Sequence, residues 1–277
     1  MAFVGKGGAG KSVIAGTFAR VLARRGEPVL AVDSDPMPGL SISLGLGVVD
    51  TPIPDEAVRE RAEDEEGPRY RLRPGLSATE AVQRYAQVAP DGVRLLQFGK
   101  LRGHVAPLLR SQFAFRQILD ELPEDRWSLI GDLPGGTRQP FFGWGRYART
   151  LLIVVEPTAK SLLSARRLAR LGLAANGPDR ILAVANKVRD AADLDLVRRR
   201  TGLEVAAALP WDEALAEAER LGRAPLDHAP GSPAVRVLES MADRFEEERV
   251  RGAGGTGDPA KRSRTDEGGG RRQGRLR

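Results

Sequence analysis

A glycine-rich loop close to the amino end constrains the fold of this chain more than any other feature. It follows the short apolar run 2–4 and fits the pattern G-x-x-x-x-G-K-[ST]. Glycines accept positive φ and lack a Cβ, so successive backbone N–H groups can point into one small concavity that an anion fills. The loop therefore predicts a nucleotide-phosphate site rather than an ordinary turn before a helix. Its residues are Gly5, Lys6, Gly7, Gly8, Ala9, Gly10, Lys11 and Ser12.

The residues in and after the loop have separate expected roles. Lys11 supplies a compact cation for the phosphates, and Ser12 supplies a hydroxyl for Mg²⁺. The apolar spacing from Val13 onward predicts a helix whose first turn directs more N–H groups at the same phosphates. Val13 itself is an expected nucleotide contact. Lys6 is unusual, because the general pattern does not require a lysine there.

Length and composition limit the architecture. A chain of 277 residues is long enough for one large α/β domain. It has no cysteine, which excludes disulfides and thiolate metal sites and favours a cytoplasmic protein. Nothing resembles a signal peptide, and no apolar run approaches the roughly 18 residues of a membrane span, so we expect no membrane contact. The first apolar run is short for a central strand, which favours a natural start a few residues upstream.

The carboxyl end differs in composition from the rest. Residues 251–277 hold eight Arg or Lys and three Asp or Glu, a balance of +5 within a whole-chain charge of +6. They contain almost no apolar side chain, so we expect a P-loop ATPase domain over 1–250 and a disordered basic Gly/Arg-rich tail over 251–277. Such a tail either contacts nucleic acid or anionic lipid, or only keeps the protein soluble, which is the commoner case.

Apolar β-type runs alternate with helical patterns along the chain. This alternation predicts a mostly parallel twisted sheet of about seven strands with helices on both faces, and the glycine-rich loop makes it an α/β fold of the P-loop NTPase kind. The segment 51–74 is charged, rich in proline and without clear periodicity, so we expect an exposed excursion there. The expected strands are 2–4, 29–32, 93–98, 127–130, 151–155, 181–185 and 204–209, and the expected later helices are 111–122, 159–173, 194–200, 212–221 and 233–250.

Two acidic segments follow predicted strands, and the carboxyl ends of parallel strands meet at one edge of a sheet. Asp33 and Asp35, in Asp-Ser-Asp-Pro, are placed to hold Mg²⁺ or its water and to orient an attacking water; capping of a turn is the alternative. Asp132 begins Asp-Leu-Pro-Gly-Gly, in which Gly135 can bring an N–H to the γ-phosphate; a Pro-Gly turn is the alternative. The expected metal set is Ser12, Asp33, Asp35 and Asp132, partly through water.

Two later segments predict where the base lies. Asn186 and Lys187 end the sixth predicted strand, and an asparagine offers both a donor and an acceptor to the edge of adenine. A guanine site of the Asn-Lys-x-Asp kind needs a carboxylate where Arg189 stands, so adenine is favoured, although Asp190 follows directly. The segment Pro210-Trp211-Asp212 closes the last predicted strand, and it either flanks the base or simply starts a helix.

Taken together, these motifs resemble the MinD/ParA family of deviant-Walker P-loop ATPases, which includes nitrogenase iron protein and arsenite-pump ATPases. The resemblance spans about residues 1–226, and the Asp-Ser-Asp-Pro-Met-Pro and Leu-Pro-Trp-Asp-Glu stretches are most similar to CooC-like proteins, ATPases linked to nickel insertion into carbon monoxide dehydrogenase. It implies a homodimer that holds ATP and Mg²⁺ between its subunits, with Lys6 reaching the phosphates bound by the other subunit. It also implies that Lys11 and Ser12 act in cis, that Asp35 positions the water and that Asp132 supports Mg²⁺.

The chain also departs from CooC-like proteins. Those proteins bind metal through a Cys-x-Cys pair, and the corresponding stretch 99–107 has none. His104 and His228 are the two histidines of the chain, too few for a convincing protein metal site, which argues against nickel handling. The aromatic stretch 135–144 is either part of the core or a partner surface exposed in one nucleotide state.

Three functions remain open on the sequence. The first is a slow ATPase that couples dimer closure to an unidentified client protein, for example in enzyme maturation. The second is a ParA-like partitioning or positioning ATPase, for which the basic tail as a DNA contact is the only support. The third is a nucleotide-binding regulator with negligible turnover. A MinD-like membrane role is disfavoured, because the predicted helix 233–250 ends in acidic rather than basic residues.

Overall fold

The computed structural model describes residues 1–35, 39–99, 105–136, 145–174 and 177–254. The chain divides into two units, Met1–Ala242 and Asp243–Arg277, and each is described by itself. His104, the aromatic stretch over 137–144 and the tail over 255–277 lie outside the described residues. The expected division of the chain at residue 250 therefore stays a prediction.

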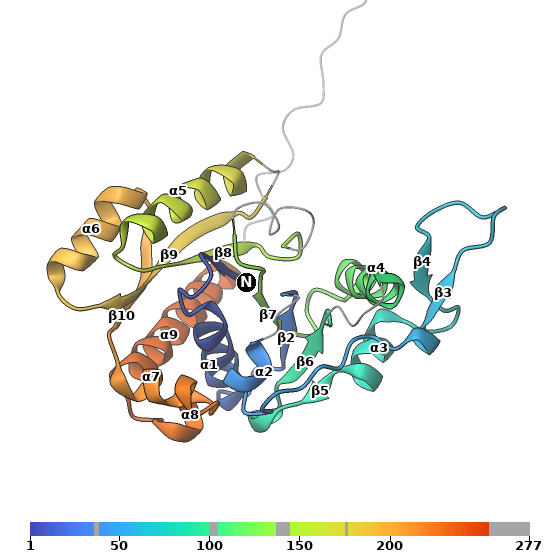
Figure 1. Cartoon of the computed structure of the whole chain (residues 1–277), viewed down its shortest axis with the longest axis horizontal. Helices are drawn as coiled ribbons and strands as arrows, with labels where there is room; N and C mark the ends of the chain where they lie inside the picture. The colour runs from blue at the N-terminus through green and yellow to red at the C-terminus, as the bar shows by residue number, and fades with distance from the viewer. Residues whose placement is uncertain (36–38, 100–104, 137–144, 175–176, 255–277) are drawn as a thin grey trace, which may run out of the picture. The chain divides into compact units, whose positions relative to one another are not determined.

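Seven parallel strands form the centre of the first unit (Figure 1). Their order across the sheet is β10-β9-β8-β1-β7-β2-β6, and a short antiparallel strand, β5, pairs with β6 at the edge. All seven predicted strands are present, and the predicted fold class is confirmed. The strands are β1 (Ala2–Gly5), β2 (Val29–Asp33), β5 (Gln87–Val88), β6 (Arg94–Gln97), β7 (Ser128–Asp132), β8 (Thr150–Val155), β9 (Arg180–Val188) and β10 (Val205–Pro210).

Helices connect the strands and flank the sheet. The five later helices expected from the sequence are present, and the first of them begins at residue 105 rather than 111. A helix that the sequence prediction missed, α3, starts at a capping box formed by Ser77 and Glu80. The helices are α1 (Lys11–Arg24), α2 (Leu40–Ser43), α3 (Ala78–Tyr85), α4 (Val105–Glu121), α5 (Ala159–Ala174), α6 (Ala191–Thr201), α7 (Glu213–Arg220), α8 (Pro225–His228) and α9 (Pro233–Gly254). None within the described residues is long and apolar enough to cross a membrane.

Alternation along the strands sends buried side chains to both faces of the sheet. On one face, Val32 of β2 packs in a cluster with α3 and α4, and Val4 of β1 packs in a cluster with α5 and α6. On the other face, the ring of Phe3 lies edge-on to Phe18 of α1, with 5.9 Å between ring centroids. Neighbouring residues of one strand point to opposite faces of the sheet. The short run 2–4 of β1 is therefore enough to pack against the helices on both faces.

The segment 51–74 is not simply an exposed excursion, and that expectation was wrong in part. Strands β3 (Val58–Glu60) and β4 (Tyr70–Leu72) form an antiparallel hairpin. Val58, Tyr70 and Leu72 are buried in the cluster with α4, while the loop between the strands is mostly exposed. Each strand has three residues, and β3 buries only its first while β4 buries its first and last, so the runs are too short to show a period of two in the sequence.

The register of the sheet brings the two predicted acidic strand ends together. Asp33 at the end of β2 pairs in register with Asp132 at the end of β7, and Asp132 pairs with Phe3 of β1 on its other side. The glycine-rich loop follows β1 directly. Three neighbouring strands therefore deliver the phosphate loop and both carboxylates to the same edge, as open α/β sheets require of their ligand sites.

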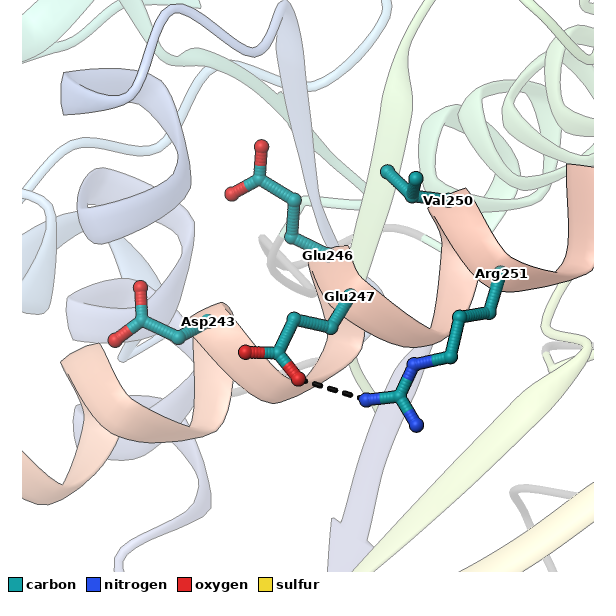
Figure 2. Close-up of a pocket in the computed structure, with 5 residues that line it drawn as sticks. All are labelled: Asp243, Glu246, Glu247, Val250 and Arg251. Carbon is teal, nitrogen blue, oxygen red and sulfur yellow. Dashed lines mark hydrogen bonds and ion pairs between the residues drawn. The ribbon is translucent and has the colours of Figure 1, made fainter. Parts of the chain in front are cut away.

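The described part of the second unit is the end of α9. Figure 2 shows Asp243, Glu246 and Glu247 along this segment, together with Val250, whose side chain is exposed. Glu247 pairs with Arg251 one turn later, with 2.7 Å between carboxylate and guanidinium atoms. The segment presents more carboxylates than cations, as its sequence indicates.

Candidate functional site

The glycine-rich loop has the conformation that its composition predicts. Gly8 and Gly10 both adopt positive φ, 81° and 90°, which side chains with a Cβ rarely tolerate. Gly10 is the N-cap residue of α1 and is also confined by its neighbours, because a Cβ there would lie 2.5 Å from Nδ2 of Asn186. The loop thus closes tightly against the end of β9 and leads straight into the first turn of α1.

The cradle formed by the loop contains a buried cation. The side chain of Lys11, the first residue of α1, is 7% exposed and forms no hydrogen bond or ion pair with a described residue. The backbone of Gly135 lies close by, since a Cβ on it would be 3.4 Å from Gly7 and 3.7 Å from Nζ of Lys11. A free ammonium beside unpaired N–H groups and a helix amino end is the arrangement that binds phosphate.

Asp132 is a buried carboxylate at this edge that lacks a partner among the described residues. It is buried, and within the described part of the chain neither carboxylate oxygen has a hydrogen-bond partner. Burial raises the pKa of Asp132 to about 6, although the charge of Lys11 opposes the shift. The Ser12 hydroxyl lies nearby and opposes it too, without the geometry of a hydrogen bond. An orphaned carboxylate beside a hydroxyl is a donor set that fits Mg²⁺.

Asp33 is placed differently from Asp132, although the two are neighbours in the sheet. Its two oxygens accept hydrogen bonds from the backbone N–H groups of Asp35 and Leu40, at 3.2 and 3.3 Å. Burial, and next the charge of Asp132, raise the pKa of Asp33 well above its usual range. The carboxylate therefore closes the turn after β2, as the structural alternative proposes, and its role toward Mg²⁺ stays a prediction.

Two further predicted residues lie at the same edge. Asp35 is partly exposed at the start of that turn, and residues 36–38 are outside the described part. Lys6 is half-buried and has no hydrogen-bond or ion-pair partner among the described residues. Its side chain is therefore available to an external anion, and the expected reach into another subunit stays a prediction.

A small pocket of about 130 Å³ lies beside the phosphate loop. All of the expected base contacts line it, from three separate parts of the chain: the loop and α1, the end of β9, and the turn after β10. The structure adds residues that the sequence prediction missed, on α1 and α7. The lining residues are Gly10, Val13, Ile14, Asn186, Lys187, Pro210, Trp211, Asp212, Leu215, Ala216 and Glu219.

The turn after β10 also starts a helix. Asp212 caps α7 by accepting a hydrogen bond from the N–H of Ala214 at 3.0 Å, which confirms the helix start that was the alternative reading of this segment. The same turn lines the pocket, and its expected contact with the base stays a prediction. Leu215 and Glu219, which the sequence prediction missed, are four residues apart on this helix and lie on one face.

Their spacing in the sequence indicates that they share a face of the helix, but it does not indicate what that face contacts.

Comparisons with known proteins agree with this geometry. A family model described as the CobQ/CobB/MinD/ParA nucleotide binding domain matches residues 1–226. An uncharacterized ATP-binding protein of Methanocaldococcus jannaschii is 29% identical over 242 residues, which covers 80% of this chain and 89% of the relative. The carbon monoxide dehydrogenase accessory protein CooC of Rhodospirillum rubrum is 29% identical over 249 residues, covering 83% of this chain and 90% of the relative.

Solved structures show the same fold. The septum site-determining protein MinD of Pyrococcus horikoshii, complexed with Mg-ADP, superposes with a TM-score of 0.68 at 17% identity, over 90% of this chain and 96% of that one. A ParA family ATPase of Chlorobium tepidum superposes with a TM-score of 0.67 at 21% identity, over 88% and 98%. The family model matches residues 1–226 and agrees with the phosphate cradle and the paired strand ends. The chain therefore belongs to the CobQ/CobB/MinD/ParA family of nucleotide-binding domains.

Proposed function

We propose that this protein is a slow, Mg²⁺-dependent ATPase that works as a dimeric switch and couples its nucleotide state to a client protein. The observation that carries the proposal is the carboxylate of Asp132, buried without a hydrogen-bond partner in the described residues, beside the buried ammonium of Lys11. Burying a charged group without a partner costs free energy of folding. This cost supports a metal cation as the partner of the carboxylate and a polyphosphate as the partner of the ammonium.

The residues of the chain divide the work as follows. The loop N–H groups and Lys11 bind and orient the phosphates, and Ser12 with Asp132 would hold Mg²⁺. When bound, the metal neutralises charge that develops on the phosphates. Asp35, partly exposed at the same edge, would orient the attacking water. Gly135, against the loop, would offer its N–H to the terminal phosphate.

Titration with Mg-ATP tests the binding step. We expect heat of binding with the native chain and almost none with Lys11→Ala, because the substitution removes the one buried cation of the described cradle. Lys160→Ala, an exposed lysine on α5, is the matched control and should bind like the native chain. If the folded native chain gives no heat with Mg-ATP, the proposal is wrong.

The dimer is tested through Lys6. Because its side chain is half-buried and has no partner among the described residues, we expect Lys6→Ala to bind Mg-ATP but to lose nucleotide-dependent dimerisation and hydrolysis. Light scattering and phosphate release measure the two effects. A Lys6→Ala variant that dimerises and hydrolyses like the native chain contradicts the trans role of this lysine. Turnover that is undetectable in the native chain, despite tight binding, would favour the regulator over the ATPase.

The proposed client is an enzyme that this protein helps to mature. CooC, to which this chain is similar, is described as an accessory protein of carbon monoxide dehydrogenase. We extend this to maturation of some enzyme, without nickel handling, since the chain has no cysteine. Asp35→Ala should hold ATP without hydrolysis and keep the dimer closed. A pull-down with this trapped variant as bait should enrich one enzyme, and a pull-down with Lys11→Ala should not.

A second candidate function, contact with DNA as in ParA-like ATPases, gains support from α5 and α6. These helices pack side by side on one face of the sheet (Figure 1). Arg198 of α6 pairs with Asp195 at 3.7 Å, but the other exposed cations form no ion pair with any described residue, and α5 contains no carboxylate. Unpaired cations on one face are the electrostatic footprint of a phosphate backbone. The cations are Lys160, Arg166, Arg167, Arg170, Arg199 and Arg200.

The salt dependence of DNA affinity tests this candidate. It also distinguishes DNA contact by α5 and α6 from DNA contact by the basic tail. If the helices bind DNA, the logarithm of the affinity falls as the logarithm of the salt concentration rises. Removing three arginines by Arg166→Ala, Arg167→Ala and Arg170→Ala should make this negative slope shallower by about 3. Deletion of residues 251–277 is the comparison, since the basic tail is the other expected contact. Absence of DNA binding by the ATP-bound native chain at low salt eliminates the candidate.

A further inference from the structure

A second hollow lies at the edge of the sheet opposite the phosphate cradle. Its volume is about 490 Å³, and it is formed by the end of α4 with the turn that follows, by residues at the starts of β1 and β7, and by the segment that leads into β8. The cradle lies at the carboxyl ends of the strands, so this hollow at their amino ends is a separate site. Its volume falls within the range of about 300–1,000 Å³ that is typical of small-molecule sites.

The floor of the hollow is apolar and aromatic. Trp127 and Leu129 alternate along the start of β7 and therefore share one face of the sheet. Gly131 comes next on that face, and Tyr147 lies against it, because a Cβ on Gly131 would overlap the Tyr147 hydroxyl. The turn after α4 adds Leu122. The side chains of Trp127, Leu129, Tyr147 and Leu122 remain partly exposed, and an apolar hollow of this kind with a polar rim marks a binding site.

The rim carries charged side chains of both signs. Glu124, after α4, pairs with Arg149, before β8, so the two sides of the hollow face each other. Asp120 is on the α4 side and Arg146 is on the β8 side. Both side chains are exposed, and neither forms an ion pair or a hydrogen bond with a described residue. The hollow therefore has an acidic side and a basic side, and each side has one charge available to a ligand.

These features together define the chemistry of a ligand. An apolar body would cover the partly exposed floor. A carboxylate on that body would pair with Arg146, and an ammonium would pair with Asp120. A ligand with only one of these charges would leave the other rim residue beside it without a partner. A short peptide with apolar side chains has both charges at its free ends, and a dipeptide is the smallest molecule with that arrangement.

We propose that this hollow binds a short apolar peptide, of about two residues, with both of its ends free. The side chains of the peptide pack on Trp127, Leu129 and Leu122, its carboxylate pairs with Arg146, and its amino group pairs with Asp120. The proposal does not rest on the proposed ATPase function, because it involves the opposite edge of the sheet.

The test uses three probes that differ only in their end charges: the dipeptide leucyl-phenylalanine, its N-acetyl form and its C-terminal amide. The chain has three tryptophans, so a chain with Trp144→Phe and Trp211→Phe reports on Trp127 alone by fluorescence. We expect saturable binding of the free dipeptide without nucleotide. Each blocked form should bind about fivefold more weakly, because it loses one partly exposed ion pair.

Substitutions at the rim connect each end of the peptide with its partner. Arg146→Ala should bind the free dipeptide and its amide alike, because the carboxylate has lost its partner. Asp120→Ala should bind the free dipeptide and its N-acetyl form alike, for the corresponding reason. Both residues are exposed, so neither substitution threatens the fold. Arg170→Ala and Asp125→Ala, at exposed positions outside the hollow, are the matched controls and should keep both preferences.

Three results would overturn the inference. Absence of a saturable fluorescence change with all three peptides, in a folded chain, means that the hollow does not bind such ligands. Equal affinities for the three peptides, or tighter binding of a blocked form, mean that the rim does not recognise both ends. A preference for the free dipeptide over its amide that survives Arg146→Ala, or over its N-acetyl form that survives Asp120→Ala, contradicts the assigned partner. None of these results bears on ATP binding, which is measured separately.

Discussion

Replacing Asp132 with asparagine should make the protein more stable in the absence of nucleotide and Mg²⁺. Burial holds the pKa of Asp132 at about 6 in the folded chain, above its ordinary value of 3.8. The difference is about two pH units, and each unit corresponds to about 1.4 kcal/mol, so the charged form costs the folded state about 3 kcal/mol at neutral pH. Asp132→Asn keeps the shape of the side chain and cannot ionise, so it avoids that cost.

The sign of the pH dependence follows from the direction of the shift. A carboxyl whose pKa is raised on folding contributes stability that is fully present below its unfolded pKa and is lost as the pH rises through its folded pKa. The native chain should therefore lose this contribution between about pH 4 and about pH 6. The advantage of Asp132→Asn should be small at the acidic end of that window and approach about 3 kcal/mol above it.

Urea unfolding with a chelator present, measured across that pH window, is the assay. Asp125→Asn, an exposed position, is the control and should leave the pH dependence unchanged. Mg-ATP should then stabilise the native chain more than Asp132→Asn, since the variant lacks the carboxylate that would hold the metal. A variant that is less stable than the native chain near neutral pH, or an advantage that does not change with pH, would refute the reasoning.

Three further predictions concern stability. Arg20 is 2% exposed and binds Asp91 at 2.7 Å and Asp227 at 2.8 Å, so Arg20→Ala should cost about 3 kcal/mol in urea unfolding, less if the half-exposed Asp227 recovers water. The hydroxyl of Tyr147 is buried without a partner in the described residues, so Tyr147→Phe should be neutral or stabilising in thermal melts. Gly131→Ala should cost about 2 kcal/mol or more in the same assay, because its Cβ would overlap the Tyr147 hydroxyl. A stable Arg20→Ala, a destabilised Tyr147→Phe or a neutral Gly131→Ala would each contradict its prediction.

The phosphate loop and the sheet were predictable because their signals are local. Successive glycines before Lys11 determine a conformation that few other sequences adopt, and the apolar runs are long enough to show their period. The hairpin at 58–72 was not predictable, since its strands have three residues each and bury only Val58, Tyr70 and Leu72 against a helix far along the chain. The start of α4 was also missed, and the helix begins six residues earlier than the periodicity indicates.

The sequence by itself determined the fold class, the phosphate cradle and the identity of the acidic strand ends, because these depend on residue types within a few positions of each other. Only the tertiary structure decided what each side chain is free to do. Asn186 looks like a base contact in the sequence, and the structure adds that one N–H of its amide is bonded to the carbonyl of Ala9, 177 residues away along the chain. Asp33 and Asp132 look alike in the sequence, yet one closes a turn and the other has no partner in the described residues. The physical reason is that hydrogen-bond satisfaction depends on which groups the fold brings within about 3 Å, and sequence spacing does not encode that distance.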